Sequence, residues 1–325
     1  MTASVHHFHA QTFQGLKPGP KLIITGAVHG NEVCGTQAIR RVLAELKAGT
    51  LHILAGRVTF VPITNPLAYE KRDRSGDRNL NRNLGPTNLP HDFEDHVANW
   101  LCPLLAEHEA LLDLHSTRAK NGAFAMLGPR DNDGDLQPFK HEEQERALAR
   151  HLGVSKFVDG WLDTYAKGVA QRMARVGTAQ SRADILNTDP RYGVGTTEYM
   201  RSVGGYAITL ECGQHEDPES PEVGYRAIHN TLAFLGMSNE APPQPVTDFE
   251  SLSMVAVTDR EHADDRFVKT WASFDVLKKG DLIGVRKDGT ELKAPDNGCI
   301  LFPDAMAKPG NEWFYFAKEN PRGSL

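Results

Sequence analysis

The sequence predicts an α/β protein: a mixed, largely parallel sheet covered by helices on both faces, followed by a smaller β-rich domain. Over the first 238 residues, short apolar runs rich in β-branched residues alternate with stretches of helical periodicity. The segment Asn239–Asp248 is polar and rich in proline, as linkers are. Short strand-like runs separated by turn signals follow it. We therefore expect a larger domain over residues 1–238 and a β-rich domain over residues 239–325.

Each element of the larger domain rests on a local pattern. Lys21–Thr25 (KLIIT) is a buried strand, and a helix follows it, because apolar residues recur at three- and four-residue intervals from Val33 up to Gly49. Gly128–Gln144 is polar and is expected to be a long loop. The remaining predicted elements are strands at Leu51–Pro62, Ala110–Leu114 and Tyr206–Leu210, helices at Asp92–Glu107 and Val223–Leu235, and C-terminal strands at Ser253–Val257, Leu282–Val285 and Cys299–Phe302.

Composition excludes several classes of function. The chain has 325 residues, 40% of them hydrophobic, which is enough for a sizeable core. A net charge of -6 does not provide the excess of positive charge that is typical of nucleic-acid-binding proteins. No apolar run reaches the roughly 20 residues that span a membrane, and the N-terminus lacks the apolar core of a signal peptide. The four cysteines form no CxxC pair, so we expect reduced thiols in a cytoplasmic protein. Nothing in the sequence indicates a homo-oligomer, and that question stays open.

Two histidines and a glutamate follow strands of the predicted sheet. His29 and Glu32 lie in GAVHGNE, between the strand Lys21–Thr25 and the helix, and His115 lies in DLHS directly after the strand Ala110–Leu114. Active sites of open α/β sheets lie at this edge. Two histidines and one glutamate complete the protein ligands of a catalytic zinc and leave one position for water. By itself each segment is also compatible with an ordinary turn; together they predict one zinc ion per chain.

Two carboxylates complete this prediction. Side chains alternate along a strand, so Asp113 points the same way as His115 and can orient its imidazole. Glu211 ends the third strand, Tyr206–Leu210, where it can serve as the base for a metal-bound water. The alternative for Glu211 is a solvated carboxylate at a strand end.

The segments GAVHGNE, NLNR, DLHS and TLEC, in this order, resemble the succinylglutamate desuccinylase and aspartoacylase family, which is related to the zinc carboxypeptidases. The resemblance runs from about Lys21 to the C-terminal region. It implies a zinc-carboxypeptidase-like fold in residues 1–238. It also implies that His29, Glu32 and His115 bind zinc and that Glu211 is the catalytic base.

The resemblance also implies substrate contacts in the arginine-rich loop Lys71–Asn83. Asn81 and Arg82 match a pair that holds a substrate carboxylate, and arginine suits such bidentate capture. Arg74 matches an arginine that stabilises the oxyanion, with Arg72 and Arg78 as competitors. Arg201 precedes Glu211 by the interval at which the family places another substrate-binding arginine. For each arginine the alternative is a solvated surface residue.

The sequence departs from the family pattern at two points. Asn79 stands where the family commonly has aspartate, which changes the internal bracing of the loop. Thr197 stands where the aspartoacylase branch has a tyrosine, and no tyrosine occurs near Met306. The missing tyrosines favour the desuccinylase branch.

We therefore expect zinc-dependent hydrolysis of the amide of a small anionic N-acyl amino acid, with N-succinylglutamate as the first candidate. The alternatives are a carboxypeptidase-like enzyme that trims short peptides and an inactive relative that only binds a ligand. An intact Glu211 argues against the inactive relative, because a site without catalysis has no need of a base.

Overall fold

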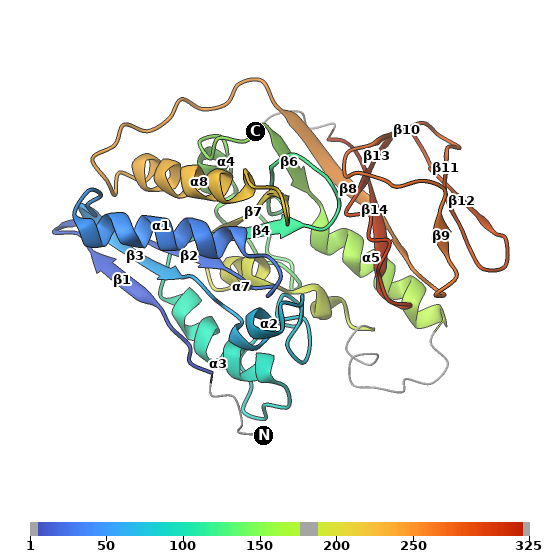
Figure 1. The fold of residues 1–325 in the computed structure, drawn as a ribbon, viewed down its shortest axis with the longest axis horizontal. Coiled ribbons are helices and arrows are strands. Elements are labelled where there is room, and N and C mark those ends of the chain that lie inside the picture. Colours follow the sequence, from blue (N-terminus) through green and yellow to red (C-terminus); the bar gives the residue numbers. More distant parts are fainter. Residues whose placement is uncertain (1–5, 176–187, 321–325) are drawn as a thin grey trace.

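A computed structural model describes residues 6–175 and 188–320, and its centre is a long sheet (Figure 1). The eleven strands are arranged in the order β1-β3-β2-β4-β7-β5-β6-β8-β14-β13-β10, and a second, three-stranded sheet has the order β12-β11-β9. The strands of the first sheet are β1 (Gln11–Gln14), β2 (Lys17–Gly26), β3 (Ala55–Val61), β4 (Ala110–Thr117), β5 (Phe124–Met126), β6 (Lys156–Asp159), β7 (Tyr206–Gln214), β8 (Glu250–Asp259), β10 (Val276–Leu277), β13 (Gly298–Leu301) and β14 (Glu312–Glu319). Those of the second are β9 (Arg266–Phe267), β11 (Leu282–Val285) and β12 (Glu291–Lys293).

The predicted fold class is confirmed, since the sheet is mixed and its centre is parallel. Strands β3, β2, β4 and β7 are consecutive parallel neighbours, and so are β5, β6 and β8. The two parallel blocks meet at the antiparallel pair β7–β5. The parallel order of β2, β4 and β7 brings their carboxyl ends to one edge of the sheet.

Helices cover both faces of the sheet (Figure 1). Along β2, Leu22 and Ile24 point to the face covered by α1 and α8, whereas Ile23 points to the face covered by α3 and α7. This alternation is the period of a strand buried on both sides. The helical segments are α1 (Cys34–Ala48), α2 (Pro66–Lys71), α3 (Phe93–Ala106), α4 (Glu142–Ala149), α5 (Trp161–Arg175), the 3-10 turn η1 (Pro190–Gly193), α7 (Thr196–Ser202) and α8 (Ser220–Phe234). None of the helices in the described ranges is long and apolar enough to cross a membrane.

The predicted elements of the first 238 residues are present, with shifted ends. β2 and β4 run further than their apolar cores, and α1 ends before Gly49, whose positive φ of 72° caps the helix. The local sequence pattern does not predict β1, β5, β6, α2, α4 or α5, and α4 begins at Glu142, inside the segment Gly128–Gln144 that is predicted to be a loop. Strands of three and four residues such as β5 and β6 are too short to show an alternating pattern.

The region after Asn239 is β-rich, as predicted, but its first strand belongs to the large sheet. β8 pairs in parallel with β6, and β14 then pairs antiparallel with β8. The second sheet contacts β14 through an apolar cluster, which Ile283 of β11 shares with Trp313 of β14. The division at residues 238 and 239 stays a prediction, because backbone pairing continues across it.

The turn between β2 and α1 has room only for glycine at one position. A Cβ atom on Gly30 would lie 1.9 Å from the carbonyl carbon and oxygen of Ala68 in α2. The neighbouring backbone is fixed as well, because the amides of Thr64 and Asn65 donate to the carbonyls of Gly26 and Ala27. The backbone next to His29 is therefore closely packed against α2, whose position is fixed by its surroundings.

We predict that Gly30→Ala destabilises the protein by about 1–3 kcal/mol, the usual cost of overpacking. Urea denaturation should show a lower midpoint with an unchanged slope. Gly85→Ala is the matched control, since nothing lies within 4 Å of a Cβ there. Equal midpoints for the two variants would contradict the close packing of Gly30.

Candidate metal and catalytic site

The predicted ligands meet at the carboxyl ends of three neighbouring strands. Gly26 at the end of β2 pairs with Leu114 in β4, and His115 pairs with Glu211 across β4 and β7. His29 and Glu32 lie in the turn that follows β2. The parallel register thus gathers residues that are up to 182 positions apart in the sequence onto one edge.

Glu32 lies between the two histidines. Its Oε1 is 2.8 Å from Nδ1 of His29, and its Oε2 is 2.8 Å from Nδ1 of His115. The ligand atoms of the three residues all lie within 4.8 Å of one another, and all three side chains are buried. Among the described residues, this is the group of histidine, cysteine or carboxylate side chains that is close enough to hold a metal ion.

The outer nitrogen of each imidazole is held by a second partner. The Nε2 of His115 is 2.9 Å from Oδ2 of Asp113, which is the predicted contact. Asp113 in turn accepts hydrogen bonds from the hydroxyls of Thr25 and Thr196. With a metal bound, Nε2 can keep its proton on the side of Asp113, and Nδ1 can then offer its lone pair to the metal.

Asn79 holds His29 in the same way. Its Oδ1 is 3.0 Å from Nε2 of His29, and it also accepts a hydrogen bond from the backbone amide of Asn81 at 2.9 Å. The position that departs from the family pattern therefore still braces the loop and orients a candidate ligand. A neutral amide oxygen does so in place of a carboxylate.

The pKa values of the group reflect burial and mutual charge. Burial and the guanidinium of Arg74 lower the pKa of His29 to about 4. Burial opposes the charged forms of Glu32 and His115 too. For these two residues the charged partners outweigh the effect of burial. The two imidazoles hold the pKa of Glu32 well below its usual range. Asp113 and Glu32 hold the pKa of His115 well above its usual value. An ion bound here would displace the proton of His115, so its affinity would depend on pH.

Glu211 faces this group as a buried carboxylate without a full set of partners. Its Oε2 has no hydrogen-bond partner among the described residues. Burial and the negative charge of Glu32 raise the pKa of Glu211 to about 8. A buried carboxylate oxygen without a partner, beside two histidines and a glutamate, fits a site for a divalent cation and its water. A cation bound there would favour the charged carboxylate form of Glu211.

The three competing arginines of the loop after α2 lie in different surroundings: one beside the site, one in the core of the loop and one on the surface. Arg74 is half-exposed, and its Nη1 donates to Oε1 of Glu32 at 3.2 Å. Arg78 is buried; it donates to the carbonyl of Arg82 at 2.6 Å and to Asp95 at 2.9 Å. Arg72 is exposed and caps α2 with a positive φ of 52°. Of the three competitors, Arg74 lies beside a candidate ligand.

Glu94 organises this loop, although no motif in the sequence points to it. Its fully buried carboxylate accepts the backbone amides of Gly76, Asp77 and Arg78 and the side-chain amide of Asn65. One sequence signal was present, since Glu94 is an acidic residue in the first turn of a predicted helix.

Asn81 and Arg82 connect the loop to the rest of the protein. Oδ1 of Asn81 accepts the backbone amide of Thr196 at 2.9 Å. The guanidinium of Arg82 lies 4.6 Å from the ring of Trp161, and its Nη2 is 3.6 Å from Oε1 of Glu312. Arg82 thus meets side chains of α5 and of the C-terminal strand β14.

Arg201 is placed away from the metal group. It is buried, its Nε is 2.9 Å from Oε2 of Glu145, and its Nη2 donates to the carbonyl of Ala207 at 2.6 Å. Ala207 precedes Glu211 by four residues in β7, which is about 13 Å along a strand. The structure therefore does not bring Arg201 to the predicted ligands, and its guanidinium is already paired.

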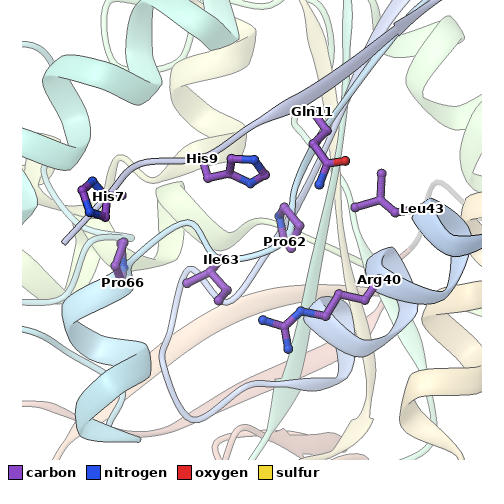
Figure 2. Close-up of a pocket in the computed structure, with 8 residues that line it drawn as sticks. All are labelled: His7, His9, Gln11, Arg40, Leu43, Pro62, Ile63 and Pro66. Carbon is purple, nitrogen blue, oxygen red and sulfur yellow. The ribbon is translucent and has the colours of Figure 1, made fainter. Parts of the chain in front are cut away.

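A surface pocket lies elsewhere, between the N-terminal segment, α1 and the turn before α2 (Figure 2). Its volume is about 300 Å³, and His7, His9 and Arg40 contribute to its lining. None of the predicted site residues lines it.

Comparison with known proteins identifies the family of this chain. Residues 18–234 match the model of the succinylglutamate desuccinylase/aspartoacylase catalytic domain, and the chain belongs to this family. It is similar to the aspartoacylase of Xenopus tropicalis, with 24% identity over 93% of this chain and 91% of that protein. It is also similar to the succinylglutamate desuccinylase of Pseudomonas aeruginosa, with 23% identity over 90% of this chain and 82% of the relative.

The solved structure of the product-bound ectoine utilization protein EutE (DoeB) from Ruegeria pomeroyi has a similar fold. Its TM-score is 0.68 at 18% identity, over 95% of this chain and 88% of that one. The predicted family and fold are confirmed.

We predict that Arg201→Met lowers the free energy of unfolding by about 3–5 kcal/mol, because it leaves the buried carboxylate of Glu145 without its partner. Arg130→Met, at a surface position, is the control. If Arg201→Met kept normal stability but lost affinity for an anionic substrate, Arg201 would be a substrate residue as the family interval implies.

Proposed function

We propose that this chain is a zinc-dependent amidohydrolase that cleaves the amide bond of an N-acyl amino acid, with N-succinylglutamate as the first substrate to test. The observation that carries the proposal is the buried group of His29, Glu32 and His115 with the unpartnered Glu211 beside it. Family membership supports it, since the relatives are named for the hydrolysis of N-acyl amino acids.

His29, Glu32 and His115 would hold the zinc ion, which, when bound, makes a water molecule more acidic and polarises a carbonyl group. The remaining steps fall to the protein. Oε2 of Glu211 accepts the proton of the attacking water and later delivers it to the nitrogen of the leaving amine. Its lack of another partner in the described chain leaves that atom free for both transfers.

Arg74 and the loop residues supply charge and orientation. The guanidinium of Arg74 lies beside the candidate ligand Glu32, which supports a role in stabilising the negative charge that develops on the carbonyl oxygen. Asn81 and Arg82 hold a carboxylate of the substrate and align its amide with the base. Arg201 takes no part in these contacts, because its guanidinium is paired with the carboxylate of Glu145.

The experiment is an amine-release assay across N-succinyl, N-acetyl and N-formyl amino acids and dipeptides, with zinc supplied. We expect turnover of N-acyl amino acids with free carboxylates, best with N-succinylglutamate, and loss of activity with a chelator. His115→Ala should lose both zinc and activity. A preference for dipeptides would favour a carboxypeptidase-like enzyme, and turnover of no substrate would favour an inactive relative.

A second prediction concerns the base. Glu211→Gln keeps the shape of the side chain and should keep the zinc content, but it cannot accept a proton, so kcat should fall by about a hundred- to ten-thousand-fold. Glu216→Gln, five residues later in an exposed turn, is the control and should retain activity. Near-normal turnover in Glu211→Gln would mean that Glu211 is a carboxylate without a catalytic role.

A further inference from the structure

His215 joins the two chain segments that carry the candidate ligands. Its Nδ1 is 2.9 Å from the hydroxyl of Ser116, and its Nε2 is 3.3 Å from Nδ2 of Asn31. The backbone amide of His215 donates to the carbonyl of Thr117 at 2.9 Å, which fixes the position of the ring at the end of β4. His215 itself follows the last residue of β7.

The two partners of the ring are the immediate neighbours of ligands in the sequence. Asn31 precedes Glu32, and Ser116 follows His115. The backbone amide of Ser116 also donates to Oε2 of Glu32 at 3.2 Å. The two hydrogen bonds that lead from Asn31 through His215 to Ser116, here called the bridge, therefore join the same two segments as the direct contact between Glu32 and His115.

The hydrogen bonds determine the protonation of the ring. An amide nitrogen can only donate, so Nε2 of His215 accepts from Asn31, and the ring proton lies on Nδ1, where it is donated to Ser116. Burial lowers the pKa of His215, which favours this neutral form.

The bridge is the main restraint on the Asn31 side chain. Within the described part of the chain, its contact to His215 is its side-chain hydrogen bond, and its Oδ1 has no partner. Without His215, the turn that carries Glu32 would lose the link through Asn31 and Ser116 and, among the described residues, would keep only the hydrogen bonds that Glu32 and Cys34 make with the segment that carries His115. Metal ligands must stay within about 0.5 Å of their productive positions.

We propose that His215 is a positioning residue of the metal centre, which holds Glu32 and His115 in place through Asn31 and Ser116 and thereby sets the affinity for zinc. This inference rests on the proposed function, because it assumes that the three ligands bind zinc. Loss of a residue that orients ligands from outside the metal typically weakens metal binding ten- to a hundred-fold.

The test is the zinc dissociation constant of the full chain, measured by competition with a chromophoric chelator. We expect His215→Ala to bind zinc about ten- to a hundred-fold more weakly than the unmodified chain. His215→Gln and His215→Asn, which each keep an amide for one of the two partners, should give intermediate values. Unchanged affinity in His215→Ala would overturn the inference.

His229→Ala is the matched control. His229 also joins two segments, with its ring nitrogens 2.9 Å from Glu45 and 2.9 Å from Glu240, but neither partner adjoins a ligand. Its loss should leave zinc affinity unchanged. An equal loss in both variants would overturn the inference, since the effect would then follow general stability.

A double-mutant cycle shows whether the bridge acts as one unit. Asn31→Ala alone should weaken zinc binding, and adding His215→Ala should weaken it by less than in the unmodified chain. Additive losses would overturn the bridge. If His215→Ala does not fold, Asn31→Ala and Ser116→Ala carry the test, and normal zinc affinity in both would count against it. If the unmodified chain binds no zinc, the metal centre of the proposed function fails first.

Discussion

The shared carboxylate of Glu32 is the interaction on which the site depends. One oxygen meets His29 and the other meets His115, and all three side chains are buried. A buried charge is tolerated only when it is paired and hydrogen-bonded. That requirement extends outward to Asp113 and the threonines that donate to it, so that the turn after β2 and the ends of β4 and α7 are fixed together.

Close hydrogen-bonded ion pairs distinguish two arginines that shape the protein from those that can meet a ligand. Arg78 and Arg201 are buried against Asp95 and Glu145, where their fixed guanidinium forks satisfy carboxylates and carbonyls of the chain itself. Arg74 is half-exposed and loosely held by Glu32. Residue type alone makes these three equal candidates, and the partners of each decide between structural and chemical roles.

The C-terminal strands reach the same region. Glu312 at the start of β14 lies 3.6 Å from Arg82 and 3.5 Å from Arg172 of α5, and Arg82 also stacks near Trp161. Asp304 lies 3.6 Å from Arg118, three residues after His115. The β-rich region thus forms ion pairs with the loop that holds Arg82 and with the end of β4, in addition to the backbone pairing of β8 with β6.

The sequence by itself determined the central strands, the helix after β2 and the place of His29, Glu32, His115 and Glu211 at neighbouring strand ends. Apolar periodicity is a local property, and the carboxyl ends of parallel strands share an edge whatever the surrounding detail. The tertiary structure alone decided the position of Arg201, the partner that holds His29, the place of β5 and β6, and the bridge through His215. These depend on contacts between residues tens to hundreds of positions apart, where burial and hydrogen-bond geometry, rather than the local pattern, select one partner.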